Sequence, residues 1–196
     1  MVDPSGLSST VVSDEGEPLI LVDESDREIG HLDKAACHNG NGVLHRAFSL
    51  FIFNRSGELL LQQRSASKRL WPLFWSNSCC SHPRQGESME TAIERRLSQE
   101  LGMSSHFHHL FTFQYQAKYL EIGSENEVCW VFAGLCDQPP RPNVHEINAV
   151  RWIAPDALDQ EFETQPDIFT PWFAMEWPQV RAMYGATLNF GSSGIA

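Results

Sequence analysis

Hydrophobic and polar residues alternate in two ways along the chain, and the two patterns predict strands and helices in different places. Short apolar stretches predict strands over residues 18–22, 46–53, 58–63, 110–117, 128–134 and 149–153. The polar residues 54–57 predict a hairpin connection between the second and third of these strands. Helices are expected over residues 88–101, from residue 155 onward and over residues 171–184.

The segment 88–101 has the clearest helical pattern. Ser88 is suited to cap its first turn, and Gly102 is suited to end it. Its apolar stripe consists of Met89, Ala92, Ile93, Leu97 and Leu101. Arg96 and Glu100 are four residues apart and therefore project from the same side of the helix. Such a pair is most often a surface ion pair of little energetic weight, and a functional pair is the alternative.

The order of the elements predicts the fold class. Strands precede and surround the helices without regular alternation, so we expect an α+β fold with a mixed β-sheet between helices. At 196 residues the chain is long enough for one domain with a sizeable core. We expect this domain over residues 18–185, a disordered acidic leader over residues 1–17 and a flexible tail over residues 186–196.

Composition and charge narrow the class of protein. Hydrophobic residues make up 42% of the chain and charged residues 20%, as in ordinary soluble proteins. No apolar run has the length of a membrane span or the form of a signal-peptide core, so a cytoplasmic protein without a membrane partner is expected. The net charge of −11 argues against nucleic acid as a partner. A small anionic substrate would require a local cluster of cations.

The chain contains five cysteines without the spacing of a zinc ribbon or a disulfide scaffold, so reduced thiols are expected. Most free cysteines are small buried hydrophobic residues, and only one with a chemical neighbourhood becomes a candidate for chemistry. Residues 75–87 provide such a neighbourhood, because two adjacent cysteines are followed there by Ser-His and by a turn before the helix.

Other candidate groups occur in pairs. His38 and His45 flank residues 39–42, whose two turn signals allow both imidazoles to reach one point, although a bare pair at this spacing is more often structural. Arg64 and Lys68 place two cations in one loop where a diphosphate can be met, although solvated loop charges are the commoner explanation.

Two of the predicted strands carry polar residues with alternating spacing. Tyr115 follows Phe113 by two residues and Glu127 follows Glu125 by two, so each pair points to one face of its strand. The two carboxylates lead into an apolar strand, which is an unusual place for a purely exposed pair.

Residues 81–103 have the spacing of a Nudix box in which several positions are changed. The residues that stand on motif positions are Glu87, Arg95, Glu100 and Gly102. The residues that depart from the motif are Ser81, Arg96 and Gln99, which replace one glycine and two glutamates. A metal-loaded pyrophosphatase needs such carboxylates to hold divalent cations against a diphosphate, so the hydrolytic function of this box is expected to be weakened.

Further stretches look like the motifs of the type I isopentenyl-diphosphate delta-isomerases, in that family's order. They are Leu44-His-Arg-Ala-Phe-Ser49, Gln63-Arg64 with Lys68, residues 75–83, Phe113-Gln-Tyr115, Glu125-Asn-Glu127 and Thr170-Pro-Trp172. The chain therefore resembles this family over roughly residues 19–177, and the number of ordered matches makes the resemblance specific.

The resemblance implies the α/β/α sandwich of the Nudix fold and the interconversion of isopentenyl diphosphate and dimethylallyl diphosphate in isoprenoid biosynthesis. The double bond moves through protonation, a tertiary carbocation and deprotonation. By family position, Cys80 and Glu127 supply acid and base on opposite faces of the substrate, and Tyr115 forms a hydrogen bond near Glu127. Trp172 offers its π face to the cation in the same resemblance.

The resemblance also implies two metals and a diphosphate site. One Zn²⁺ or Mn²⁺ per chain would be held by His38, His45, His82, Glu125 and Glu127. Mg²⁺ would be held by Glu100 and the backbone carbonyl of Cys80. The diphosphate would be bound by Lys34, Arg64, Lys68 and Arg96.

Two alternative functions remain open at this point. A Nudix pyrophosphatase would use Glu87 and Glu100, but the missing carboxylates at positions 96 and 99 count against it. A non-catalytic metal-binding or ligand-sensing module would keep the fold and the histidines, without a reason to keep Cys80 as well. For the isomerase we expect a small-molecule prenyl diphosphate substrate and a monomer or weak dimer.

Overall fold

The structure is a computed structural model and describes residues 10–184. Within that range the strands form one nine-stranded sheet. The strands are β1 (Pro18–Val22), β2 (Glu28–Asp33), β3 (His45–Phe53), β4 (Leu59–Arg64), β5 (Trp75–Ser76), β6 (Cys79–Ser81), β7 (Phe107–Tyr119), β8 (Gly123–Leu135) and β9 (Ile147–Ile153). The helices are α1 (Lys34–Cys37), α2 (Met89–Leu101), α3 (Pro155–Thr164) and α4 (Pro171–Tyr184), with a short 3₁₀ turn at Pro166–Ile168.

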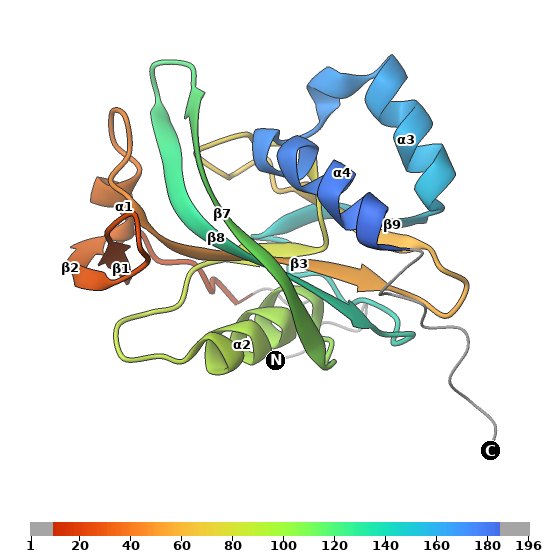
Figure 1. The fold of residues 1–196 in the computed structure, drawn as a ribbon, viewed down its shortest axis with the longest axis horizontal. Helices are drawn as coiled ribbons and strands as arrows, with labels where there is room; N and C mark the ends of the chain where they lie inside the picture. The colour runs from red at the N-terminus through yellow and green to blue at the C-terminus, as the bar shows by residue number, and fades with distance from the viewer. Residues whose placement is uncertain (1–9, 185–196) are drawn as a thin grey trace.

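The sheet is mixed and β3 lies at its centre. This strand pairs antiparallel with β1, β4 and β6 and parallel with β8, while β8 also pairs antiparallel with β7. Helix α2 lies on one side of the sheet, and α3 and α4 lie on the other (Figure 1). The expected α+β fold with a mixed sheet between helices is confirmed.

Strand β3 shows why two layers of helix cover one sheet. Successive side chains of a strand point to opposite faces. Phe48, Leu50 and Ile52 belong to the core beneath α2. Ala47, Phe51 and Phe53 belong to the core beneath α4, where they meet Trp172, Phe173 and Trp177. Because both faces of β3 are covered, the strand reads in the sequence as a nearly continuous apolar run.

Helix α2 begins and ends where the sequence predicts. The Ser88 side chain accepts a hydrogen bond from the backbone N–H of Thr91, and Gly102 adopts the left-handed conformation with φ of 60°. The expected surface position of Arg96 and Glu100 is wrong, however, because the two residues are only 2% and 3% exposed. They lie on the face of α2 that meets Glu146 and the Lys68 loop.

Two segments differ from the sequence expectation. The strand predicted over residues 110–117 begins earlier, because β7 starts at Phe107 and includes His108 and His109. In that strand the His109 ring lies 4.9 Å from the Trp130 ring of β8. Strand β2 and the short helix α1 have too little hydrophobic periodicity to be predicted from the sequence. In the structure, β2 pairs with β1, and α1 is hydrogen-bonded to the neighbouring turn.

The predicted leader lies partly within the described residues. Residues 12 and 13 contact Arg96, since the Val12 carbonyl and the Ser13 hydroxyl accept hydrogen bonds of 3.0 and 3.2 Å from its guanidinium. Asn143 donates a 2.8 Å hydrogen bond to the Thr10 carbonyl. Residues 1–9 and the predicted tail 186–196 lie outside the described residues. Among residues 10–184, no helix combines the length and apolar character needed to cross a bilayer.

Candidate active site

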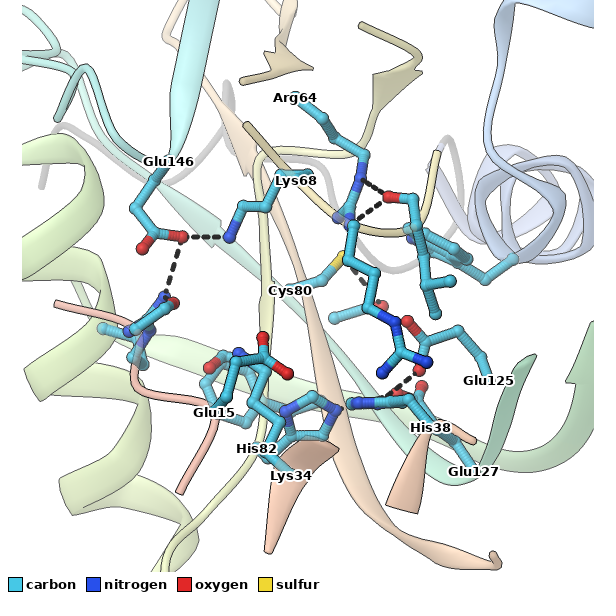
Figure 2. Close-up of a pocket in the computed structure, with 18 of the residues that line it drawn as sticks. Glu15, Lys34, His38, Arg64, Lys68, Cys80, His82, Glu125, Glu127 and Glu146 are labelled. Carbon is cyan, nitrogen blue, oxygen red and sulfur yellow. Dashed lines mark hydrogen bonds and ion pairs between the residues drawn. The ribbon is translucent and has the colours of Figure 1, made fainter. Parts of the chain in front are cut away.

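One cavity of about 440 Å³ brings most of the predicted site residues together. Its walls come from β3, β4, β6, β7, β8, α1, α2, α4 and the loop after β4 (Figure 2). The predicted residues that line it are Lys34, His38, Arg64, Lys68, Cys80, His82, Arg96, Tyr115, Glu125, Glu127 and Trp172. His45 and Glu100 do not line it.

Strand register explains how residues distant in the sequence meet. His45 of β3 is the parallel register partner of Glu127 in β8, and Tyr115 of β7 is the antiparallel partner of the same glutamate. Ser49 of β3 is the partner of Cys80 in β6. Cross-strand partners project to the same face of a sheet. The thiol, the phenol and the carboxylate therefore all lie on the face that α4 covers.

Five side chains form a compact group at one end of the cavity. Each of them offers one nitrogen or oxygen atom, and all five atoms lie within 4.8 Å of one another. His38 Nε2 lies 2.8 Å from Glu125 Oε2, and His82 Nε2 lies 2.9 Å from Glu127 Oε1. The group consists of His38, His45, His82, Glu125 and Glu127, the set predicted from the sequence.

The donor atoms of this group suit a divalent cation. His45 Nδ1 lies 2.7 Å from the Val43 carbonyl, which can only accept, so this nitrogen carries the proton and Nε2 presents its lone pair to the group. Among the described residues, His45 Nε2 is buried without a hydrogen-bond partner, a costly state that a bound cation would relieve. Three imidazole nitrogens and two carboxylates are ligands that Zn²⁺ and Mn²⁺ accept.

The protonation states of His82 and Glu127 also fit a metal. Burial, together with the nearby His45 and His38, holds the pKa of His82 well below its usual range, so His82 is neutral. Burial alone would raise the pKa of Glu127, but the neighbouring His45 and the hydrogen bond from Tyr115 leave it below its usual value. A neutral imidazole and an ionised carboxylate are the forms that bind metal.

Glycine at position 123 allows His38 to reach the group. The backbone N–H of Ser124 donates a 3.0 Å hydrogen bond to the His38 carbonyl, which ties the end of α1 to the start of β8. A Cβ atom on Gly123 would lie only 2.3 Å from that carbonyl oxygen. Only glycine therefore permits this close approach of the two backbones.

The two adjacent cysteines have different surroundings. Cys79 lies in the core beneath α2, whereas Cys80 points into the cavity. Cys80 Sγ donates to Asn77 Oδ1 at 2.8 Å and lies 3.5 Å from Ser49 Oγ. Burial raises the pKa of Cys80 to about 12, and the charges of Glu176 and Glu127 act in the same direction. In this structure Cys80 is thus a neutral thiol beside the carboxylates.

The predicted diphosphate contacts gather on the same cavity. Burial lowers the pKa of Lys34, and the positive charges of Lys68 and Arg96 lower it further. Such mutual repulsion between cations is relieved by an anionic ligand. Arg64 is held in place by hydrogen bonds of 2.9 Å to the Leu70 carbonyl and 3.1 Å to the Trp71 carbonyl.

Glu146 is a member of this cluster that the sequence does not reveal, because it lies alone in a turn. Its carboxylate pairs with Lys68 and lies 3.3 Å from Arg96 (Figure 2). Burial raises the pKa of Glu146, but these two cations outweigh burial and bring it to about 2. Glu146 therefore stays ionised and holds both cations beside the cavity.

The carboxylates of the Nudix box are bound by arginines. Glu87 accepts two hydrogen bonds of 2.7 Å from Arg95. Glu100 Oε1 accepts a 2.8 Å hydrogen bond from Arg96 Nε, and Glu100 lies behind the cavity wall. The predicted Mg²⁺ site of Glu100 and the Cys80 carbonyl stays a prediction.

Aromatic rings close the other side of the cavity. Trp172 is buried, and its indole N–H donates a 3.0 Å hydrogen bond to Ser76 Oγ. Its ring lies 6.4 Å from that of Tyr115, and the Arg64 guanidinium carbon lies 5.2 Å from its centroid. Glu176, one helical turn after Trp172, is a buried carboxyl that the sequence analysis missed, although this spacing was an available signal.

Comparisons with known proteins agree with this geometry. The family model of the NUDIX domain matches residues 43–173. Isopentenyl-diphosphate Delta-isomerase 1 of Photorhabdus laumondii is 41% identical over 166 residues, which cover 84% of this chain and 94% of that protein. Isopentenyl-diphosphate Delta-isomerase of Nocardia farcinica is 40% identical over 158 residues, covering 80% of this chain and 90% of that protein. The isopentenyl-diphosphate Delta-isomerase of Serratia proteamaculans is 43% identical over 157 residues, which cover 80% of this chain and 87% of that protein.

Solved structures show the same fold at lower identity. DR0079 from Deinococcus radiodurans superposes with a TM-score of 0.68 at 23% identity, covering 83% of this chain and 98% of that one. The MutT protein of Methanosarcina mazei superposes with a TM-score of 0.56 at 17% identity, covering 71% of this chain and 94% of that one. The chain therefore belongs to the Nudix superfamily and, within it, to the family of isopentenyl-diphosphate Delta-isomerases.

Proposed function

We propose that the protein interconverts isopentenyl diphosphate and dimethylallyl diphosphate with Cys80 and Glu127 as its acid and base. The observation that carries this proposal is that a thiol, a carboxylate and a cluster of cations share one cavity of about 440 Å³. The cations suit the diphosphate end of the substrate, and the thiol and the carboxylate suit its hydrocarbon end.

The reaction requires one proton to be added and another to be removed. Addition of a proton to the terminal carbon of the double bond leaves a tertiary cation on the neighbouring carbon. Loss of a proton from the next carbon, toward the diphosphate, forms the more substituted double bond. No net proton is consumed, so one group must donate and another must accept. Cys80 and Glu127 both line the cavity, and they are the groups proposed to carry these two transfers.

Tyr115 and Asn77 are proposed to orient these two groups. The Tyr115 hydroxyl donates a 2.7 Å hydrogen bond to Glu127 Oε2. Asn77 Oδ1 accepts from the Cys80 thiol at 2.8 Å. Each reactive group therefore has a fixed direction before substrate binds.

The cationic intermediate needs walls that attract it without capturing it. Trp172 is proposed as such a wall, since an indole face stabilises a cation by about 2 kcal/mol or more in a dry site. Its indole N–H is already hydrogen-bonded to Ser76. This bond fixes the ring and engages the N–H, the one polar group of the side chain.

The diphosphate is proposed to bind to Lys34, Arg64, Lys68 and Arg96. Arg96 replaces a carboxylate of the Nudix box, so a position that holds metal in a hydrolase here presents a cation to the phosphate oxygens. In the same proposal Glu100 and the Cys80 carbonyl would hold Mg²⁺, which would offset the negative charge of the diphosphate.

The group of three histidines and two glutamates is proposed to hold one Zn²⁺ or Mn²⁺. When bound, this ion would add positive charge beside Glu127 and so favour its ionised form. His38, His45, His82 and Glu125 would hold the ion together with Glu127, and the protein's own residues carry the proton transfers.

A pyrophosphatase is the second candidate, and its missing carboxylates count against it. Positions 96 and 99, where a Nudix hydrolase would direct carboxylates at metal ions, carry Arg96 and Gln99 instead. The test is incubation of the purified protein with isopentenyl diphosphate and Mg²⁺, with dimethylallyl diphosphate and released phosphate followed in the same sample.

Formation of isomer without phosphate supports the proposed function. Phosphate release would favour the hydrolase, and neither product, with metal present, would favour a binding module. The matched variant is Cys80→Ala, measured with its metal content. Isomerase turnover that survives this substitution would remove Cys80 from the mechanism.

A further inference from the structure

Glu176 is a fully buried carboxyl group that the proposed reaction does not use. It lies on α4, and its Oε1 is 3.6 Å from Cys129 Sγ. Its side chain is also hydrogen-bonded to that of Ser49. Within residues 10–184, its Oε2 has no hydrogen-bond partner. A buried carboxyl with so few donors around it is costly unless it is neutral or has a role.

The surroundings of Glu176 favour its neutral form. Burial raises its pKa to about 8, and the negative charge of Glu127 adds to this, against the hydrogen bonds from Ser49 and Cys129. The titratable groups that face it are Glu127 and Cys129 on β8 and Cys80 on β6. On α4 itself, Arg181 is bound instead to Asp156 and Asp159. Glu176 thus changes charge a little above neutral pH.

Ser49 joins Glu176 to the proposed catalytic thiol. Its hydroxyl oxygen lies 3.5 Å from Cys80 Sγ and 3.5 Å from Cys129 Sγ. Cys80 directs its own proton to Asn77, so its sulfur remains able to accept a hydrogen bond from the other side. A serine hydroxyl has a single proton, which can be donated to only one acceptor at a time.

The direction of the Ser49 hydroxyl depends on Glu176. A neutral carboxylic acid has an O–H that can donate to Ser49 Oγ, which leaves the serine proton for the Cys80 sulfur. An ionised carboxylate only accepts, so it draws the serine proton to itself and away from Cys80. We propose that Glu176 is a positioning residue that, through Ser49, sets whether a hydrogen bond is donated to the sulfur of Cys80.

This inference rests on the proposed function, because the hydrogen bond matters when Cys80 exchanges a proton with the substrate. A donated hydrogen bond stabilises negative charge on the sulfur and helps Cys80 to gain and lose its proton. The neutral acid is therefore the active form. Isomerase kcat is expected to fall as the pH rises through about 8, the value to which burial raises the pKa of Glu176.

The test compares Glu176→Gln, Glu176→Leu and Ser49→Ala with the wild-type holoenzyme, as kcat and KM between about pH 6 and pH 10. Glutamine donates to Ser49 as the neutral acid does but cannot ionise. Glu176→Gln should keep kcat within about 3-fold of the wild-type value at neutral pH. It should not show the decrease in kcat at alkaline pH that ionisation of Glu176 causes in the wild type. Glu176→Leu and Ser49→Ala should lower kcat about 10-fold with little change in KM. Glu163→Gln, on the exposed face of α3, is the matched control and should follow the wild type.

A double variant and a spectroscopic readout complete the test. In the Ser49→Ala background, Glu176→Leu should add little, because the two residues act through one chain of hydrogen bonds. The carbonyl stretch of a protonated carboxyl, measured by infrared difference between the wild type and Glu176→Gln, should disappear as the pH rises. This readout needs no turnover, so it separates the inference from a failure of the proposed function. The same decrease in kcat at alkaline pH in the wild type and Glu176→Gln would overturn the inference. So would a wild-type kcat in Glu176→Leu.

Discussion

Tyr115 and Glu127 face each other across the β7–β8 ladder, and the tyrosine hydroxyl donates a 2.7 Å hydrogen bond to Glu127 Oε2. This bond lowers the pKa of Glu127, against the burial that raises it. Tyr115→Phe should leave the fold intact and lower isomerase kcat about 10- to 100-fold, because the carboxylate loses both its orientation and a stabilising donor. Steady-state kinetics measure this effect.

Tyr119→Phe is the matched control, because it removes one hydroxyl from the same strand. Tyr119 packs its ring 5.0 Å from that of Trp71 and has no place in the proposed proton transfers. Equal rates for the two variants would contradict the assigned role of Tyr115.

The two adjacent cysteines should respond differently to substitution. Cys80→Ser is expected to lower kcat about 100-fold or more, because a hydroxyl is a poorer acid and base than a thiol at this position. Cys79→Ala should keep the rate and reduce the free energy of unfolding by about 1 kcal/mol, because Cys79 fills the core beneath α2. Kinetics together with urea unfolding distinguish these effects, and a reversed pattern would mean that the thiols are wrongly assigned.

The sequence predicts much of this arrangement, since its signals are local. Ser88 and Gly102 fix the ends of α2, and the motif around Trp172 places it at the start of α4. Which of Cys79 and Cys80 faces the cavity depends on the register of β6 against β3, which pairs Ser49 with Cys80. Register between strands so far apart in the chain is a tertiary property that no local pattern contains.

Burial of charged groups is the part that sequence reasoning missed. Arg96 and Glu100 have the spacing of a surface pair, yet Glu146, from a turn distant in the sequence, also pairs with Arg96. Glu176 is similar: its spacing from Trp172 indicates a shared helix face, but not the strand residues that bury it. Such groups are identified only when the packing of separate elements is known.

Metal content should depend on His45, although this residue lies behind the cavity wall. Its Nε2 lies 3.6 Å from Glu127 Oε1 and is presented to the group by the bond from Nδ1 to Val43. His45→Gln should lower the affinity of the protein for Zn²⁺ or Mn²⁺ about 10-fold or more, as measured by metal analysis after dialysis. His109→Gln, an exposed histidine of β7, is the control and should retain the metal. Equal metal content in both variants would exclude His45 as a ligand.

Glu146 should give the protein a stability that depends on pH. Its pKa is lowered from 4.5 to about 2 in the folded protein, chiefly because Lys68 and Arg96 outweigh burial. A lowered carboxyl pKa stabilises the fold fully above about pH 4.5, and this contribution is lost as the pH falls toward 2. Its magnitude at neutral pH is about 3 kcal/mol.

The variant Glu146→Gln tests this by urea unfolding across that range. The difference in unfolding free energy between the wild type and the variant should be largest at neutral pH and should shrink as the solution becomes more acidic than about pH 4.5. A difference that stays constant with pH would show that Glu146 acts through packing and not through its charge.

The central claim is that groups of the protein add one proton to the substrate and remove another. Incubation of the metal-loaded protein with isopentenyl diphosphate and Mg²⁺ in D₂O tests this most directly, with the initial dimethylallyl diphosphate examined by NMR. Because Cys80 and Glu127 exchange their protons with solvent, the account predicts deuterium in the methyl group formed from the terminal carbon. Product without deuterium would mean that hydrogen moves within the substrate, and it would contradict the account.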